Sequence, residues 1–225
     1  QPVYADPERS AGYLAFTLDD NPGDDSSLLL DSAAVVSDAT WPNAPAVSGG
    51  KVYPVVIGTP GSFRKPDGTL STTSGSPAYP LAESGSNYTK LLIAGHDVEA
   101  TSVTVFDGVG TSSQSFSVTR ETDGLGRLVA TVDISSPGAI SPKEAEYWVV
   151  WDNGGGIGSH FASTALEGLG DVCAWALLRT SLRVDVPKWI AEAGILNRVK
   201  VGTYITEPTL RPWSFVARIL DSILV

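Results

Sequence analysis

The chain has 225 residues, of which 42% are hydrophobic and 18% charged, so it can bury a hydrophobic core and is not a disordered chain. It has 25 Asp and Glu against 15 Lys and Arg, and a net charge of −10 excludes a broad basic face for nucleic acid. We therefore expect no sequence-specific nucleic-acid binding. Because no apolar run reaches the ~18 residues of a membrane-spanning helix, no membrane span is expected either.

Two residue types are unusually rare in this chain. The sequence contains no methionine and ends on the apolar residues 223–225, so we expect a segment of a longer protein or a chain processed at its N-terminus. Its single cysteine, Cys173, excludes an intrachain disulfide framework. That cysteine usage is compatible with assembly in a cytosol.

Turn and strand patterns divide the chain into three regions. We interpret residues 1–40 as an extended, acidic N-terminal segment, residues 41–152 as an antiparallel β module and residues 153–225 as a helix-rich region. Strands are expected at residues 52–57, 90–94, 102–106, 116–119, 128–132 and 147–151. Their spacing of roughly 10–15 residues leaves no room for crossover helices, which predicts an antiparallel barrel or sandwich. With the helix-rich region, the predicted fold class is α+β.

One stretch of the β module lacks this pattern. Residues 58–89 are rich in Ser, Thr, Gly and Pro, and a connection of that length is usually an exposed or functional excursion. A hairpin extension with weak patterning is the alternative. We therefore expect residues 58–89 to leave the β module as a long excursion.

The helix-rich region begins with apolar residues at three- and four-residue steps between Leu166 and Leu177. Ser163 or Thr164 is the expected N-cap, with Glu167 as the capping-box partner of Thr164.

Three further elements are expected behind this first helix. Asp185 and Pro187 predict the start of a second, short helix, and Gly194 predicts its end. Residues 199–206 are expected as a strand, and Pro212 is expected to open a third helix that runs to about residue 223.

A glycine-rich loop at residues 154–158 follows an expected strand and precedes a helix, which is the context of a phosphate-binding loop. Ser159 stands where the third glycine of the dinucleotide motif belongs, and no parallel sheet is expected beside it. A strand-to-helix hinge or a close approach at a subunit contact is favoured. No cofactor is expected.

The residue types of a hydrolase are present without their usual spacing. Ser159 precedes His160, but Phe161 stands where a nucleophile turn requires glycine. A triad built on His96, an Asp and a remote Ser is a minor alternative, and so is a carboxylate pair drawn from Asp133, Glu144, Glu146 and Asp152. Cys173 lies on an apolar helical stripe, which favours a buried thiol with a raised pKa. We therefore do not expect an enzyme.

Metal ligands are too sparse to predict a site. The acidic run at residues 19–25 could hold Ca²⁺, but Leu30 stands where an EF-hand requires glutamate. A solvated acidic turn is favoured, and no metal is expected.

Aromatic residues in or near the β module could instead form a carbohydrate-binding face: Trp41, Tyr53, Tyr79, Tyr88, Tyr147, Trp148 and Trp151. In residues 147–151, strand alternation predicts Trp148 and Val150 buried on one face, with Tyr147 and Trp151 on the other. The tripeptide 87–89, Asn-Tyr-Thr, matches an N-glycosylation sequon, which matters only in a eukaryotic secretory setting.

Four stretches of the C-terminal third carry a family resemblance: residues 166–181, residues 184–189 (Val-Asp-Val-Pro-Lys-Trp), residues 201–208 (Val-Gly-Thr-Tyr-Ile-Thr-Glu-Pro) and residues 212–215 (Pro-Trp-Ser-Phe). In this order they resemble the tail-tip (baseplate) hub proteins of long-tailed bacteriophages. Residues 53–60 (Tyr-Pro-Val-Val-Ile-Gly-Thr-Pro) are similar to the stretch that opens the barrel-like module of some hubs.

The resemblance implies a structural component of the virion, located at the tail tip and assembled in the host cytoplasm. Such hubs form rings, typically of three copies, that close the tail tube and contact other tail-tip and tail-tube proteins. Large aromatic residues dominate interface energetics, so we expect subunit or partner contacts at Trp175, Trp189, Trp213 and Phe215. An acidic chain would suit a lumen through which DNA passes. The alternatives are a carbohydrate- or surface-binding β module and, less favoured, a hydrolase.

Overall fold

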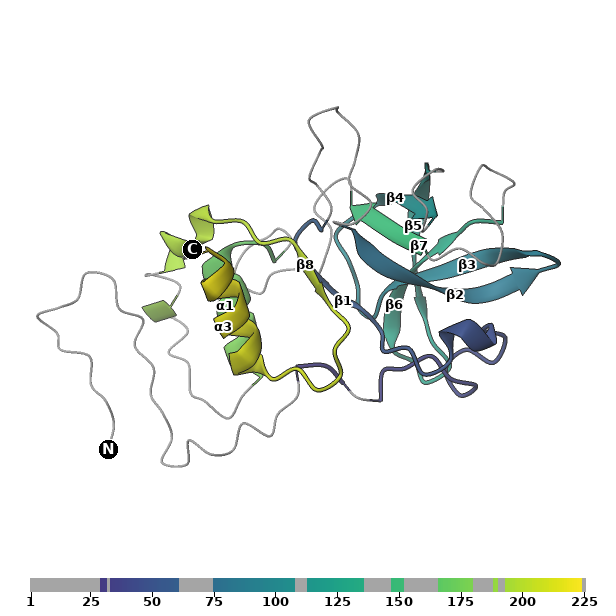
Figure 1. Cartoon of the computed structure of the whole chain (residues 1–225), viewed down its shortest axis with the longest axis horizontal. Coiled ribbons are helices and arrows are strands. Elements are labelled where there is room, and N and C mark those ends of the chain that lie inside the picture. Colours follow the sequence, from purple (N-terminus) through teal and green to yellow (C-terminus); the bar gives the residue numbers. More distant parts are fainter. Residues whose placement is uncertain are drawn as a thin grey trace, which may run out of the picture. The chain divides into compact units, whose positions relative to one another are not determined.

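The computed structural model describes residues 29–31, 33–60, 75–107, 113–135, 147–151, 166–179, 188–189 and 193–223. The chain divides into two compact units. The β unit comprises residues 33–166 and 202–206, and the helical unit comprises residues 1–32, 167–201 and 207–225. The elements are mixed helices and antiparallel strands, so the predicted α+β class is confirmed (Figure 1).

Six strands of the β unit close into an antiparallel barrel, which decides between the expected barrel and sandwich. They are β2 (Ser76–Ser84), β3 (Asn87–Ala94), β4 (Ser102–Asp107), β5 (Ser113–Thr122), β6 (Leu128–Asp133) and β7 (Tyr147–Trp151). Their order around the barrel is β2-β3-β6-β5-β4-β7, and β7 pairs with β2 to complete it. Closure leaves these six strands without a free edge along the barrel wall.

Strand alternation separates the apolar side chains of the barrel into two layers. The interior cluster includes Leu91, Val132 and Val149, all fully buried. The next residue along β3, Leu92, points to the opposite face and packs with Val36 in a second cluster. Residues 33–53 therefore cover one outer face of the barrel, and a short 3-10 turn, η2 (Ala46–Ser48), lies in this segment.

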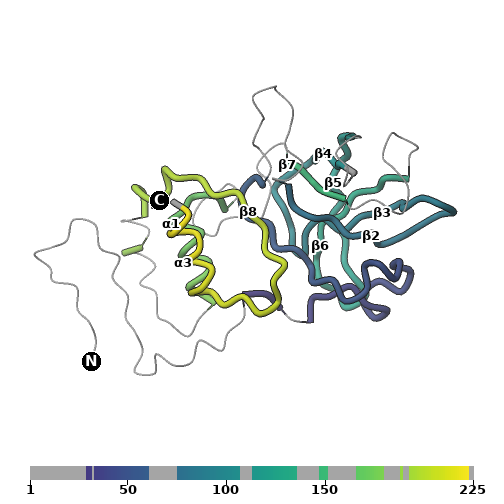
Figure 2. Tube along the Cα trace, in the orientation of Figure 1, coloured from purple at the N-terminus to yellow at the C-terminus, as the bar shows by residue number. Residues whose placement is uncertain are grey.

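The strand β2 lies within the stretch that we expected to leave the β module. Residues 76–84 pair with both β3 and β7 and so complete the barrel; Figure 2 follows them into the β2–β3 hairpin. The strand contains Pro77 and Pro80, which lack N–H donors, and its pairing with β3 is irregular between Pro80 and Glu83. Because of these features, the sequence pattern does not predict a strand here. Residues 61–74 of the expected excursion lie outside the described residues.

The two faces expected for residues 147–151 are confirmed, but the face that we expected to be the core is the outer one. Tyr147 and Trp151 face the barrel interior together with Val149, and Tyr147 makes an edge-on contact with Tyr88 at 6.0 Å between ring centroids. Trp148 faces outward and is half-buried. Alternation alone gives the two faces of a strand but not which face is the core.

A buried polar network ties residues 33–53 to the turn between β5 and β6. The Asp123 carboxylate is fully buried and accepts hydrogen bonds from the Tyr53 hydroxyl (3.0 Å) and from Arg127 Nε (2.9 Å). Its second oxygen accepts the backbone N–H groups of Leu125 and Arg127, both at 2.9 Å. Trp41 Nε1 donates to the Tyr53 hydroxyl at 2.9 Å, so the network joins three segments.

The residue after Asp123 has no room for a side chain. A Cβ atom at Gly124 would lie 2.3 Å from the Ala39 carbonyl oxygen, and the Gly124 N–H already donates to the Thr40 oxygen at 2.9 Å. We expect Gly124→Ala to lower the free energy of unfolding of the β unit by about 1–3 kcal/mol, because two backbone segments must separate. Gly194→Ala is the control, since a Cβ atom added there would meet nothing within 4 Å. Urea titration of both variants measures the difference, and equal midpoints would contradict the expected crowding.

A second, two-stranded sheet of the β unit pairs β1 (Val55–Ile57) with β8 (Thr203–Ile205). The strand expected at residues 199–206 is thus confirmed over three residues only. Val201 instead donates its N–H to the Glu167 oxygen at 2.7 Å, and an isolated bridge joins Gly168 to Lys200. These contacts belong to the helical unit.

The helical unit contains α1 (Leu169–Leu177), the 3-10 turn η4 (Leu196–Arg198) and α3 (Pro212–Ile223). The N-cap of α1 is Gly168 and has no side-chain hydrogen bond, so the capping box expected from Glu167 is wrong. The backbone of Glu167 and Gly168 pairs with residues 200–201, so the helix begins after these two residues. Residues 163–164 lie outside the described residues.

The third predicted helix is confirmed. It begins at Pro212, and its buried face carries Phe215, Val216 and Ile219 at the expected helical spacing. Of the second predicted helix, residues 188–189 are helical, whereas residues 185–187 and 190–192 lie outside the described residues.

Candidate functional site

Of the four predicted contact residues, Trp175 and Phe215 meet each other. Their rings, from α1 and α3, form an edge-on pair with centroids 6.3 Å apart, and both side chains are buried. The Arg179 guanidinium lies 3.9 Å from the centroid of the Trp175 ring, and Arg179 Nη1 donates to the Trp175 carbonyl oxygen at 3.0 Å. This pair therefore forms the core of the helical unit.

Trp189 is the third predicted residue and is also buried. Its Nε1 donates to the Gly170 carbonyl oxygen at 2.9 Å, within the first turn of α1. The same turn is held by Asn197, which accepts the Asp171 N–H at 3.0 Å and donates Nδ2 to the Asp171 carboxylate at 2.8 Å. Gly170 allows residues 193–197 to pack closely on this turn, because a Cβ at Gly170 would lie 2.7 Å from the Ala193 side chain. Trp189 thus stabilises its own unit.

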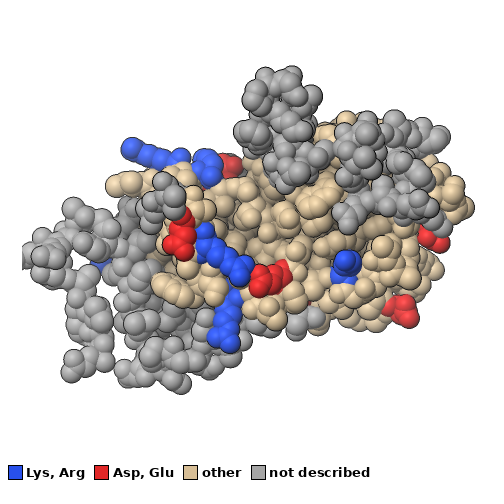
Figure 3. Space-filling view, viewed as in Figure 1, with Lys and Arg blue, Asp and Glu red and all other residues tan. Residues whose placement is uncertain are grey.

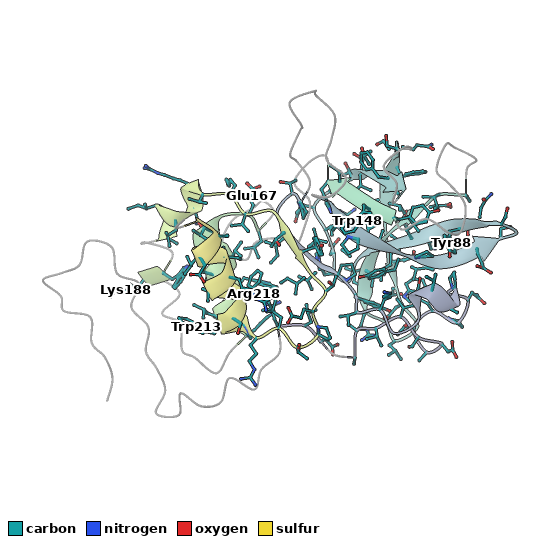
Figure 4. The ribbon with its side chains drawn as sticks, in the orientation of Figure 1. Tyr88, Trp148, Glu167, Lys188, Trp213 and Arg218 are labelled. Atoms are coloured by element: carbon teal, nitrogen blue, oxygen red, sulfur yellow. The ribbon has the colours of Figure 1, made fainter. Side chains whose placement is uncertain are left out.

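Trp213 differs from the other three because 51% of it is exposed. It occupies the first turn of α3, where Figure 4 labels it. Within this unit, Leu178, Ile195 and Val199 are exposed as well, Ile195 to 74%. Sequence reasoning missed these three aliphatic residues, which carry no distinguishing motif.

The two units carry the same net charge. Over the full sequence, the helical unit contains eight Lys and Arg against thirteen Asp and Glu, and the β unit contains seven against twelve, so each has a net charge of −5. On the face drawn in Figure 3, Lys and Arg residues adjoin Asp and Glu residues. Ion pairs described in the helical unit join Lys200 to Glu167 at 2.7 Å and Arg218 to Glu207 at 2.8 Å. Net charge therefore does not distinguish the two units.

His96 and Cys173, the described candidates for a catalytic base and a nucleophile, both have structural roles. His96 Nε2 accepts the Val56 N–H at 2.9 Å, and its Nδ1 lies 2.6 Å from the Asp97 carbonyl oxygen. Burial raises the pKa of the Cys173 thiol to about 11, as predicted, so it is a poor nucleophile. Ser159, His160 and the glycine-rich loop at residues 154–158 lie outside the described residues.

Of the four carboxylate candidates, Asp133 is the one within the described residues. Asp133 is exposed at the end of β6, where the Ser135 side chain and N–H lower the pKa of its carboxyl. Glu144, Glu146, Asp152 and the acidic run at residues 19–25 lie outside the described residues. Among the residues that are described, no three His, Cys, Asp or Glu side chains could share a metal ion.

The aromatic residues considered for a carbohydrate face do not form an exposed platform. Tyr53, Tyr88, Tyr147 and Trp151 are buried. The remaining three are half-buried: Trp41, Tyr79 and Trp148. Asn87 of the sequon is exposed at the start of β3. Over the described ranges, no helix is long and apolar enough to cross a membrane.

Comparison of the chain with family models, curated proteins and solved structures finds no match. The hub resemblance of the C-terminal third therefore stays a prediction.

Proposed function

We propose that this chain is a structural component of a phage tail tip, forming an oligomeric ring of three copies at the end of the tail tube. In this proposal the ring connects the tube to receptor-binding or fibre proteins, is assembled in the host cytoplasm and becomes part of the virion. The observation that carries the proposal is the exposure of Trp213, which lies in the Pro-Trp-Ser-Phe stretch on which the resemblance rests.

Exposed tryptophan is characteristic of protein contacts, because the ring gains contact area with little loss of conformational entropy. Among the residues that the structure describes, four of the seven large hydrophobic residues with high exposure belong to the helical unit: Leu178, Ile195, Val199 and Trp213.

Quantitative mass spectrometry of density-purified tailed particles from the source organism tests the proposal. We expect a few copies per particle, in fixed ratio to the tube protein. Absence of the chain from the particles, with free chain in the lysate, would contradict a tail-tip role and direct attention to glycan binding.

Trp213→Asp is expected to reduce incorporation into particles by at least about tenfold, because it places an unpaired charge in a desolvated contact. Leu125→Asp is the matched control: Leu125 is 60% exposed but lies in the β5–β6 turn, and this variant should assemble normally. Incorporation is measured by complementing a deletion phage and counting copies per particle. Equal incorporation of the two variants would show that Trp213 is not part of the interface.

A further inference from the structure

One edge of the β1–β8 sheet is open. In β1, the Val56 N–H donates to His96 Nε2 at 2.9 Å and so points away from β8. Val56 is paired with Tyr204, and in antiparallel strands such a pair has its backbone groups on the outer sides. The N–H and C=O of Tyr204 therefore point away from β1. By alternation, those of Gly202 and Thr206 do the same.

The two edges of this sheet differ in their hydrogen bonding. Along β1, the Pro54 oxygen accepts the Gly95 N–H at 2.8 Å, and the Gly58 N–H donates to the Leu166 oxygen at 2.8 Å. His96 covers the position between them. Along β8, no described residue forms a backbone hydrogen bond to the outward groups of residues 202, 204 and 206. The closed barrel and the capped edge of β1 thus leave β8 as a template for another strand.

Aromatic rings accompany this open edge. The rings of Tyr204 and Trp148 make an edge-on contact with centroids 6.2 Å apart; Trp148 is labelled in Figure 4. The pKa of Tyr79 is raised to about 12, mainly by burial of its hydroxyl and to a smaller extent by the nearby Tyr204. All three rings are half-buried, so an apolar side chain on an added strand would cover their exposed parts.

The chemistry of the occupant follows from these two features. Alternating backbone donors and acceptors are matched by an extended peptide, and the rings favour apolar side chains at alternate positions. Residues 13–18 of this chain, Tyr-Leu-Ala-Phe-Thr-Leu, have this pattern, with Leu14, Phe16 and Leu18 alternating, and they carry no charge. They lie outside the described residues.

We propose that residues 13–18 of one copy add as a strand to the open edge of β8 in a neighbouring copy. The inference rests on the proposed ring, in which it supplies the contact from each copy to the next. Backbone hydrogen bonds provide the affinity, and the alternating apolar side chains against Tyr204 and Trp148 provide the register.

Sedimentation velocity of the purified full chain, over a range of concentrations, tests this pairing with two matched pairs of variants. Thr206→Pro removes an outward N–H that β1 does not use, whereas Thr206→Val keeps it. Phe16→Pro removes a donor from the added strand, whereas Phe16→Ile keeps both donor and pattern. We expect both proline variants to raise the dissociation constant of the oligomer by at least about tenfold, and both controls to leave it within about twofold.

A photo-crosslinker at position 206, in an equal mixture of ¹⁵N-labelled and unlabelled chains, identifies the occupant directly. Crosslinks from one copy to residues 13–18 of another support the inference. Crosslinks confined to a single copy, crosslinks to other residues, or a monomeric wild type overturn it. Hydrogen exchange of the barrel amides shows whether each proline variant is folded; an oligomer that persists in both folded proline variants also overturns it.

The failure of this inference is distinguishable from the failure of the proposed function. Proline variants that still enter tailed particles at the wild-type copy number would exclude strand addition and leave the tail-tip role standing. If the chain is absent from particles but crosslinks still join residue 206 to residues 13–18 of another copy, the tail-tip role is excluded and strand addition stands.

Discussion

Asp123→Ala is expected to lower the free energy of unfolding of the β unit by about 3–5 kcal/mol. The variant leaves the buried Tyr53 hydroxyl and the Arg127 guanidinium without their shared carboxylate, and it frees two backbone N–H groups of the turn. Removing one partner of a buried charge pair costs more than the pair itself contributes, because the other charge, here the half-buried Arg127, stays partly desolvated.

Asp133→Ala is the matched control for this prediction. Asp133 is also an aspartate of the β5–β6 hairpin, but it is exposed and its carboxylate accepts the Ser135 N–H at 2.8 Å at the end of β6. Its loss should change the unfolding free energy by about 0.5 kcal/mol or less. Hydrogen exchange of the β5 and β6 amides measures both variants in the β unit alone. A loss for Asp123→Ala no larger than for the control would contradict the structural role of the network.

The same carboxyl predicts a pH dependence. Burial alone would raise the pKa of Asp123, but hydrogen bonds from Arg127, Leu125 and Tyr53 outweigh it and hold this pKa below its ordinary value. A carboxyl with a lowered pKa stabilises the folded state above the unfolded-state pKa of about 3.9, and this contribution is lost as the pH falls through the folded value. We expect β-unit stability to fall below about pH 4, and less steeply in Asp123→Ala.

Trp151→Ala is expected to cost the β unit about 3–5 kcal/mol. Trp151 is 1% exposed in the barrel interior, and its Nε1 donates to Ser76 Oγ at 2.8 Å, joining β7 to β2. The variant removes the largest side chain of the interior and leaves a buried hydroxyl at the point where the barrel closes.

Trp148→Ala, three residues away on the same strand, provides the comparison. It faces outward and is half-buried, so a loss of about 1–2 kcal/mol is expected. Chemical denaturation followed by circular dichroism measures both variants without relying on tryptophan fluorescence. Equal losses at the two positions would mean that the interior and the outer face of β7 are assigned the wrong way round.

The strands that could be predicted are those whose β-branched and aromatic residues alternate without interruption, such as β4 and β6. The strand β2 could not be, because Pro77 and Pro80 are unfavourable in a strand; here the neighbouring strands on both sides impose the extended form. The start of α1 was missed for a similar reason. Glu167 has the right spacing for a capping box, but its carbonyl oxygen is bound to Val201, a residue 34 positions later.

The sequence also could not tell which of the candidate contact residues are exposed. Sequence identified four large aromatics in the helix-rich region, and the structure separates them by exposure: three are buried against their own unit, and Trp213 is exposed. Every residue of α1 is buried, so this helix has no polar face from which a pattern could assign its aromatic residue to the core. Only the positions of the other elements decide which ring stays exposed.

The pairing of β1 with β8 has a consequence for the order of events during synthesis. Val55 is paired with Ile205, 150 residues later, and the whole segment 167–201 of the helical unit lies between the two parts of the β unit. All six barrel strands leave the ribosome before β8 does. For that interval β1 has only one neighbour along its length, and the nascent chain exposes an unpaired edge that the finished protein covers. A nascent chain from which residues up to 151 have emerged from the ribosome, but residues 203–205 have not, should therefore carry a closed barrel with β1 accessible to chaperones or to a neighbouring nascent chain.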